Sequence, residues 1–269
     1  MALILQTNQH YLRNAQTLGH LAIAAYAPKP AEDAAFKKTM FTEATSFVHG
    51  PTSSLGYWTV SDDHVVLAFA GTNDIRDWLT NIHFAMVPEL GGKAHRGFSQ
   101  ALDAIWSIFF TKIKLHTDAG RKLWITGHSL GGALATLAAR RLPTSMKPAG
   151  VYTFGQPRVG DTTYAKKYKL KHHRFVHNKD IVPTVPSRFI PGAFPPAFYT
   201  HVGSLEFFDK NKKLVGSSSD ELGLMPELQE ALSQLSTTTT EAQAKELILD
   251  GIRDHSMKAY LECLAKNVP

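Results

Sequence analysis

The segment LWITGHSLGGALATLAA (residues 123–139) has the pattern of a short apolar strand, a sharp glycine-rich turn and a helix. At its centre Ser129 has a glycine two residues before it and another two residues after it. A strained strand-to-helix turn needs such small neighbours, and it lifts the serine hydroxyl clear of the sheet at a helix N-terminus. We therefore predict that Ser129 is a nucleophile; a purely structural turn is the alternative.

Strand-like and helix-like segments alternate along the rest of the chain. Apolar runs predict strands at 65–70, 123–126, 151–154 and 174–177, and apolar residues at helical spacing predict helices over 12–25, 98–113 and 134–142. This order predicts an α/β fold, with a mostly parallel sheet covered by helices on both faces. We expect one domain over residues 1–269. We also expect an insertion at about 209–241, where runs of serine (217–219) and threonine (237–240) resemble connectors around a short amphipathic helix.

Composition excludes several classes of protein. The chain has 269 residues, of which 43% are hydrophobic and 19% charged, as in ordinary globular proteins. The lone Cys263 excludes a disulfide within the chain and a four-cysteine zinc site. No apolar stretch reaches the roughly 18 residues of a transmembrane helix. Residues 1–9 contain no basic and no long apolar region, so we expect no secretory signal and a location in the cytoplasm or export without a cleavable signal.

The charge is modestly positive, at +6 with 13 histidines. The only dense basic run extends from Lys166 to Arg174 and is interpreted as a solvated helix end and strand entry. One short basic run is a small footprint for nucleic-acid binding, so we expect no such partner. The positive balance mildly favours an anionic lipid surface.

A serine nucleophile needs a histidine base and a carboxylate that orients it. In a sheet with this turn the partners follow in the order acid, then histidine. Asp180 comes just past a predicted strand and is the favoured acid, whereas Asp161 looks like a helix N-cap. His255 lies where a loop meets the closing helix and is the favoured base, whereas His201 lies inside a strand pattern and is expected to be structural.

The oxyanion formed during acyl transfer needs preset hydrogen-bond donors. One is the backbone N–H of Leu130, directly after the nucleophile. The second should come from the loop after an earlier strand. Thr72 follows the most apolar strand and offers both an N–H and a hydroxyl.

At this point the chain resembles a known family, the class 3 lipases, whose best-known members are fungal triacylglycerol lipases. The matching segments appear in family order and are VLAFAGTNDIRDWLTNIHF (66–84), AHRGFSQAL (94–102), LWITGHSLGGALATLAA (123–139), YTFGQPRVGD (152–161), FVHNKDIVPTVP (175–186), YTHVGSLEF (199–207) and RDHSMKAYL (253–261). The resemblance implies the α/β-hydrolase fold and a triad of Ser129, Asp180 and His255. It also implies an oxyanion residue at Thr72 and a short helical lid directly after it.

The residues of the implied lid, at 74–84, support it independently. Ile75, Trp78, Leu79 and Ile82 form a narrow apolar stripe at helical spacing, with polar residues elsewhere. The lid hypothesis is that this stripe covers the site in water and turns towards lipid at an interface. An ordinary helix that faces the core is the alternative.

Three features remain open at this level. The family's secreted fungal members carry disulfides and a signal segment, which we do not find here. The amphipathic helix at 209–241 is a second flap or a surface decoration. The aromatic and proline-rich loop around Phe194 walls an acyl groove or simply packs as a rigid loop.

We therefore expect a monomeric serine carboxylic-ester hydrolase that acts on lipid esters at a lipid–water interface, through an acyl-enzyme. No metal or organic cofactor is required. Phospholipase A1 action and hydrolysis of short-chain or aromatic esters are alternatives on the same triad. A non-catalytic, lipase-like interaction protein is the alternative from another class.

Overall fold

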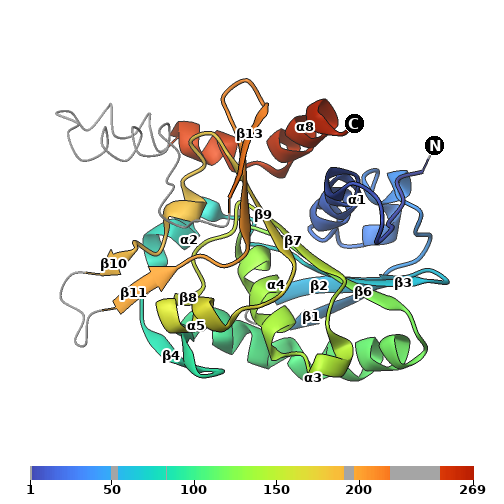
Figure 1. Cartoon of the computed structure of the whole chain (residues 1–269), viewed down its shortest axis with the longest axis horizontal. Coiled ribbons are helices and arrows are strands. Elements are labelled where there is room, and N and C mark those ends of the chain that lie inside the picture. Colours follow the sequence, from blue (N-terminus) through green and yellow to red (C-terminus); the bar gives the residue numbers. More distant parts are fainter. Residues whose placement is uncertain (1, 50–53, 83, 191–196, 219–248) are drawn as a thin grey trace.

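The computed structural model describes residues 2–49, 54–82, 84–190, 197–218 and 249–269. An eight-stranded sheet crosses the molecule in the order β1-β2-β3-β6-β7-β9-β12-β13 (Figure 1). Neighbouring strands from β3 to β12 are parallel, and the pairs β1–β2, β2–β3 and β12–β13 are antiparallel. The strands are β1 (Thr45–His49), β2 (Ser54–Val60), β3 (His64–Phe69), β6 (Lys122–His128), β7 (Gly150–Phe154), β9 (His172–His177), β12 (Ser204–Phe208) and β13 (Leu214–Ser218).

Helices cover both faces of this sheet, which confirms the predicted α/β layering. Contacts place α1 (Tyr11–Ala24) and α8 (Met257–Asn267) together on one face, and α3 (Arg96–Asp118) and α4 (Leu130–Arg141) on the other. Alternate residues of a strand serve the two layers. In β3, Leu67 and Phe69 join the α3/α4 core, whereas the intervening Ala68 joins the α1/α8 core.

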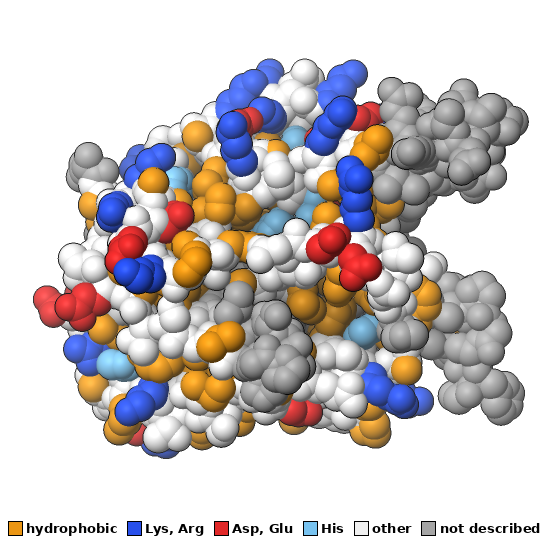
Figure 2. Space-filling model, turned by 180° about the vertical axis from the view of Figure 1, so that it is seen from behind, with side chains coloured by type: hydrophobic (Ala, Val, Ile, Leu, Met, Phe, Trp, Pro, Cys, Tyr) orange, Lys and Arg blue, Asp and Glu red, His pale blue; other side chains and the backbone are white. Residues whose placement is uncertain are grey.

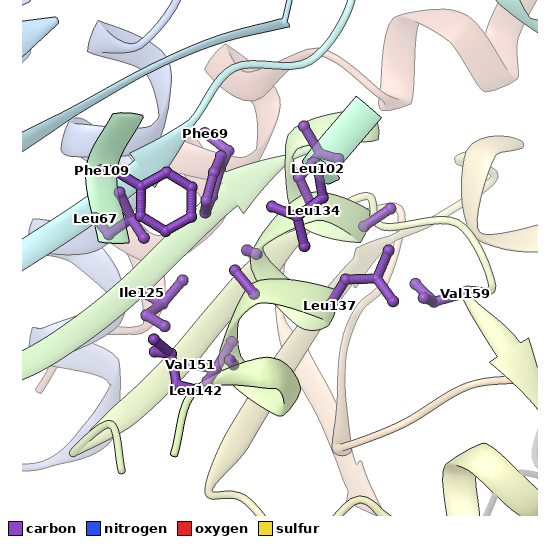
Figure 3. Packing of buried hydrophobic residues seen from close by; sticks show 14 of the residues in the cluster. Leu67, Phe69, Leu102, Phe109, Ile125, Leu134, Leu137, Leu142, Val151 and Val159 are labelled. Atoms are coloured by element: carbon purple, nitrogen blue, oxygen red, sulfur yellow. The ribbon is translucent and has the colours of Figure 1, made fainter. Parts of the chain in front are cut away.

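Figure 3 shows the α3/α4 core, where Phe69 and Phe109 meet Leu102 and Leu134 between the sheet and the two helices. These side chains are almost completely buried. Burying each large apolar side chain contributes about 1.5–3 kcal/mol, so this layer holds β6 and α4 firmly in place. The predicted nucleophile lies at the junction of these two elements.

A second, smaller sheet lies beside the first, in the order β10-β11-β8-β5-β4. The alternation pattern does not predict it, because its strands have only two to four residues. They are β4 (Met86–Glu89), β5 (Gly92–His95), β8 (Gly160–Asp161), β10 (Phe189–Ile190) and β11 (Ala197–Thr200). The N-cap role predicted for Asp161 is confirmed, because its side chain accepts a hydrogen bond from Tyr164 N at the start of α5 (Thr162–Lys167).

Several predicted boundaries need correction. The connector expected at 217–219 is wrong at its start. Ser217 and Ser218 belong to β13 and pair with Glu206 and Leu205 of β12. The rest of the predicted insertion, including its amphipathic helix, lies outside the described residues, as does Phe194. His201 is not inside a strand. It lies in the connection between β11 and β12, where the following Gly203 has a φ of +77°.

Candidate active site

Ser129 lies in the turn between β6 and α4 with φ 59° and ψ −130°, a backbone conformation that residues other than glycine rarely adopt. Close packing around the turn explains its glycines. A Cβ on Gly131 would lie 2.2 Å from the carbonyl oxygen of Phe69, and one on Gly127 would lie 2.2 Å from the carbonyl oxygen of Gly131. Ser129 is buried, and its Oγ has no hydrogen-bond partner among the described residues. The sequence therefore folds here as a strained turn that presents an unengaged hydroxyl.

Asp180 and His255 form a buried pair, although 75 residues separate them. Asp180 lies in the turn after β9, and His255 lies between a helical stretch at 249–254 and α8. His255 Nδ1 is 2.9 Å from both carboxylate oxygens of Asp180. Because a carboxylate only accepts, Nδ1 carries a proton, and in a ring protonated at Nδ1 alone Nε2 is an acceptor. Nε2 is buried and has no hydrogen-bond partner within the described ranges.

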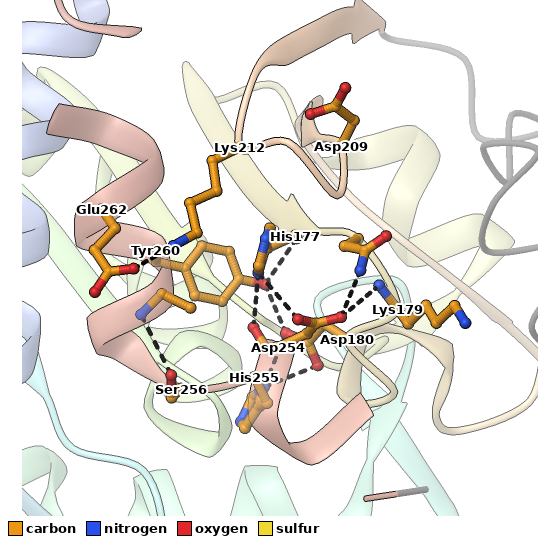
Figure 4. A network of polar contacts seen from close by, with 12 residues as sticks. His177, Lys179, Asp180, Asp209, Lys212, Asp254, His255, Ser256, Tyr260 and Glu262 are labelled. Atoms are coloured by element: carbon orange, nitrogen blue, oxygen red, sulfur yellow. Dashed lines mark hydrogen bonds and ion pairs between the residues drawn. The ribbon is translucent and has the colours of Figure 1, made fainter. Parts of the chain in front are cut away.

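Two further donors hold the Asp180 carboxylate. The Tyr260 hydroxyl donates to Oδ2 at 2.6 Å, and the backbone N–H of Val182 donates to Oδ1 at 2.9 Å. Tyr260 also accepts a hydrogen bond from the His177 amide at 3.2 Å. Burial, followed by the nearby Asp180 charge, raises the pKa of Tyr260, so it remains a hydroxyl donor. The carboxylate thus has a fixed orientation (Figure 4).

Asp254 joins the segments that carry the acid and the histidine. Its Oδ2 accepts hydrogen bonds from Asn178 Nδ2 at 2.8 Å and from the Lys179 amide at 3.1 Å. Figure 4 shows these contacts beside the Asp180–His255 pair. Asp254, next to His255, therefore holds the turn that contains Asp180 through two hydrogen bonds. These bonds fix the positions of the two segments relative to each other.

Gly155, at the end of β7, lies against the same pair. It has a φ of +56°, and a Cβ on it would lie 2.7 Å from both Asp180 Oδ2 and His255 Nδ1. Any side chain would therefore displace the imidazole or the carboxylate. The sequence marks this glycine only as the residue after an apolar strand, so its role could not be recognised there.

The two predicted oxyanion donors lie beside one pocket near Ser129. A Cβ on Gly71 would be 2.9 Å from the Cβ of Ser129, so the end of β3 lies next to the predicted nucleophile. The pocket has a volume of about 600 Å³. Its lining includes both predicted donors and apolar side chains from α2 (Ile75–Asn81), from the residue that follows α2 and from α3: Thr72, Trp78, Ile82, Phe98, Ala101 and Leu130.

The predicted lid contains a shorter helix than its expected span of 74–84. Asp74 caps α2 through the Asp77 amide at 2.9 Å, and Ile82 is already extended. Ile75, Trp78, Leu79 and Ile82 are half-buried, and no residue of α2 is fully buried. Trp78 stacks on Phe98 with ring centroids 6.3 Å apart. The helix therefore lies on the surface, and Trp78 and Ile82 of its stripe line the pocket together with the polar Asp77 and Asn81.

The rival residues lie elsewhere. Asp161 caps α5, and His201 Nε2 donates to the carbonyl of Pro183 at 2.8 Å. Burial lowers the pKa of His201 well below its usual range, so it is a neutral structural residue. Among the described residues, no group of His, Cys, Asp or Glu could hold a metal ion.

Charged and hydrophobic side chains are interspersed on the surface. In Figure 2, Lys and Arg side chains are spread around the face, with exposed hydrophobic side chains between them. Within the described part of the chain, no helix is long and apolar enough to cross a membrane.

Comparisons with known proteins agree with this geometry. The family model for lipase (class 3) matches residues 66–190. A lipase from Rhizopus niveus is 35% identical over 157 residues, which cover 53% of this chain and 40% of the relative. The secreted mono- and diacylglycerol lipase 1 of Fusarium solani is 32% identical over 154 residues, covering 52% of this chain and 45% of the relative. The chain therefore spans less than half the length of these curated relatives.

Solved structures extend the likeness to most of the chain. Lipase II from Rhizopus niveus superposes with a TM-score of 0.68 at 25% identity, covering 87% of this chain and 92% of that one. A lipase from Rhizopus microsporus var. chinensis gives a TM-score of 0.63 at 28% identity, covering 73% and 74%. The mostly parallel sheet and its flanking helices are thus the α/β-hydrolase fold of these lipases.

Proposed function

We propose, on the premise that this chain belongs to the class 3 lipase family, that it hydrolyses carboxylic esters of lipids through an acyl-enzyme. The observation that carries the proposal is the 2.9 Å contact between His255 Nδ1 and Asp180, in a chain whose Ser129 lies at a strained strand-to-helix turn. Ester cleavage needs these three groups. Within these three side chains, Ser129 Oγ and His255 Nε2 have no hydrogen-bond partner in the part of the chain that the structure describes.

The proposed mechanism follows from the chemistry of each group. Ser129 Oγ attacks the ester carbonyl while His255 Nε2 takes its proton, and Asp180 stabilises the imidazolium that forms. The amides of Leu130 and Thr72 bind the oxyanion, and His255 then gives the proton to the leaving alcohol. Water attacks the acyl-enzyme in the second half, again with His255 as the base.

An ester panel tests the proposal. Wild-type protein and Ser129→Ala are assayed on acylglycerols, phospholipids and short-chain or aromatic esters, with the exposed Ser145→Ala as the matched control. We expect long-chain acylglycerol to be the best substrate, with its hydrolysis lost in Ser129→Ala and retained in Ser145→Ala. Equal activity of Ser129→Ala and wild type would overturn the assignment. A complete lack of ester hydrolysis by wild type would favour an interaction protein.

The half-buried stripe of α2 supports a lid that covers the pocket in water. Trp78 and Ile82 line that pocket, and turning the helix outward would expose them to lipid. We expect the rate on a triglyceride to rise abruptly once the substrate exceeds its solubility limit. Trp78→Ala should reduce this rise, whereas Thr80→Ala, on the exposed side of the same helix, should keep it. Smooth saturation of the wild type through that limit would reject the lid.

A further inference from the structure

A hydrogen-bonded chain outside the triad ends on the backbone of His255. The Tyr26 hydroxyl is 2.7 Å from His128 Nδ1, and His128 Nε2 is 2.7 Å from the carbonyl oxygen of His255. His128 directly precedes the nucleophile, and Tyr26 follows α1. The three residues thus come from opposite ends and the middle of the sequence.

The partners of His128 fix its protonation state and tautomer. A carbonyl oxygen only accepts, so His128 Nε2 carries a proton and donates it to His255. Burial, and then the neighbouring His255, lower the pKa of His128 to about 3, so the ring is neutral near pH 7. Its Nδ1 is therefore an acceptor, and the Tyr26 hydroxyl is the donor. Reversing this tautomer would lose the contact with the His255 carbonyl, because an Nε2 without a proton cannot donate to it.

The rings of His128 and His255 stack, with centroids 4.5 Å apart and planes inclined by 30°. Gly155 lies close to the Nδ1 and Cε1 atoms of the same imidazole. Three neighbours thus restrict the rotation of the His255 ring. They are the ring of His128, the backbone of Gly155 and the carboxylate of Asp180. A charged His128 would oppose the imidazolium formed on His255, because like charges at this separation repel.

Tyr26 also contacts the segment that holds the predicted oxyanion donor. Its hydroxyl oxygen lies against the backbone of Gly71, one residue before Thr72. A Cβ on Gly71 would come within 2.4 Å of that oxygen, so the approach requires the glycine. Tyr26 therefore links the end of β3 to His128, and His128 links it to His255.

We propose that Tyr26 and His128 are positioning residues, which together set the depth and ring orientation of His255 relative to Ser129 and Thr72. This inference rests on the proposed ester hydrolysis. Neither side chain touches the reacting atoms. Their effect is on the fraction of molecules in which His255 Nε2 can receive the serine proton.

Kinetics on a soluble ester give the first test. His128→Phe keeps an aromatic ring but loses both hydrogen bonds, and we expect kcat to fall about 100-fold, as misplacement of a catalytic group by about 1 Å does. His128→Gln restores a donor and an acceptor without the stacked ring, and we expect it to recover about tenfold of that loss. Tyr26→Phe should lower kcat roughly 5–20-fold. KM should stay within about twofold in all three, because the pocket is untouched.

Matched controls separate positioning from general damage to the fold. Tyr57 donates to the carbonyl of Leu21 at 2.8 Å, so Tyr57→Phe also removes a buried tyrosine hydroxyl that contacts α1. His172 is likewise a buried imidazole, and it lies between the hydroxyls of Thr153 and Tyr168. We expect Tyr57→Phe and His172→Gln to keep kcat within twofold, even where their Tm falls as far as that of the test variants.

Nitrogen NMR of ¹⁵N-histidine-labelled protein gives a readout that needs no activity. We expect His128 in the wild type to remain neutral with the proton on Nε2 from pH 5 to 9, and Tyr26→Phe to shift its Nδ1 resonance. A protonated His128 at pH 7, or an Nδ1–H tautomer, overturns the proposal. So does wild-type kcat in both His128→Phe and Tyr26→Phe while Ser129→Ala is inactive. Full activity of Ser129→Ala would instead overturn the proposed function.

Discussion

The two halves of the proposed catalytic machinery are held by different forces. Around Ser129 the main chain does the positioning: β6, α4 and the end of β3 approach so closely that only glycine fits at 127 and 131. Around Asp180 and His255 the positioning comes from side-chain hydrogen bonds. The turn after β9 and the loop before α8 meet through Tyr260, Asp254 and the acid–base pair itself.

This difference predicts how each half responds to mutation. A backbone-built turn either forms with the fold or fails with it, because its contacts belong to the buried core. A hydrogen-bonded pair can be loosened one bond at a time while the fold survives. Graded losses of activity with little loss of stability should therefore come from the Asp180–His255 half.

The largest effect is expected from Asp180→Asn. The amide NH₂ would favour the His255 tautomer with its proton on Nε2, which cannot accept the serine proton. We expect kcat to fall about 10⁴-fold, as in serine hydrolases with this change. Asp161→Asn is the matched control, and it should keep kcat because an asparagine still caps α5. Steady-state kinetics on a soluble ester measure kcat for both variants. Comparable activities of Asp180→Asn and Asp161→Asn would contradict the choice of Asp180 as the acid.

Gly155→Ala should follow, with a loss of about 100-fold in kcat. Its Cβ would lie 2.7 Å from Asp180 Oδ2 and His255 Nδ1, so the pair must move apart. Gly120→Ala is the control, since Gly120 also has a positive φ, of +88°, but a Cβ there meets nothing within 4 Å. Both variants should lose about 1 kcal/mol of stability through the strained backbone. If they lose activity equally, contact with the pair is not the cause.

Tyr260→Phe should lower kcat about 3–10-fold. It removes one of the donors to Asp180 and leaves the contact with His255 in place, so the carboxylate is less firmly oriented. Tyr57→Phe again serves as a control for the loss of a buried hydroxyl. Unchanged kcat with a lowered Tm would make Tyr260 a residue of the core alone.

The smallest effect is expected from Asp254→Ala. Its loss frees the amide of Lys179 and the side chain of Asn178, which weakens the link between the two segments. We expect a two- to threefold fall in kcat and a loss of roughly 1–2 kcal/mol in the free energy of unfolding. Denaturation with urea measures the second value. Removal of the exposed partner in Asp250→Ala should change neither, because its ion pair with Arg253 lies on the surface.

Much of the main sheet could be predicted because its central strands are continuous apolar runs. Such runs are typical of strands buried on both faces, as β3 and β6 are. The smaller sheet was missed because strands of two to four residues show no periodicity. The β1–β2 hairpin was missed too, although Phe47 and Tyr57 are buried.

The residues of the site likewise divide into those with a local sequence signal and those without one. Ser129 could be chosen from sequence because the turn imposes glycines at fixed spacing. Asp180 and His255 could be proposed because one follows a strand and the other precedes a helix. Tyr260, Gly155 and Tyr26 could not be recognised, because their roles depend on which segments meet in space. Tyr260 had one local signal: it lies five residues after His255, on the helix that begins there.

The strained backbone at Ser129 has a consequence for the evolution of this chain. A non-glycine residue with this φ and ψ lowers stability by about 1–3 kcal/mol, whereas glycine tolerates the same angles. Ser129→Gly should therefore be an inactive protein that is at least as resistant to heat as the active one. Selection for thermal stability alone would favour glycine at this position, so the presence of serine agrees with its proposed role as the nucleophile.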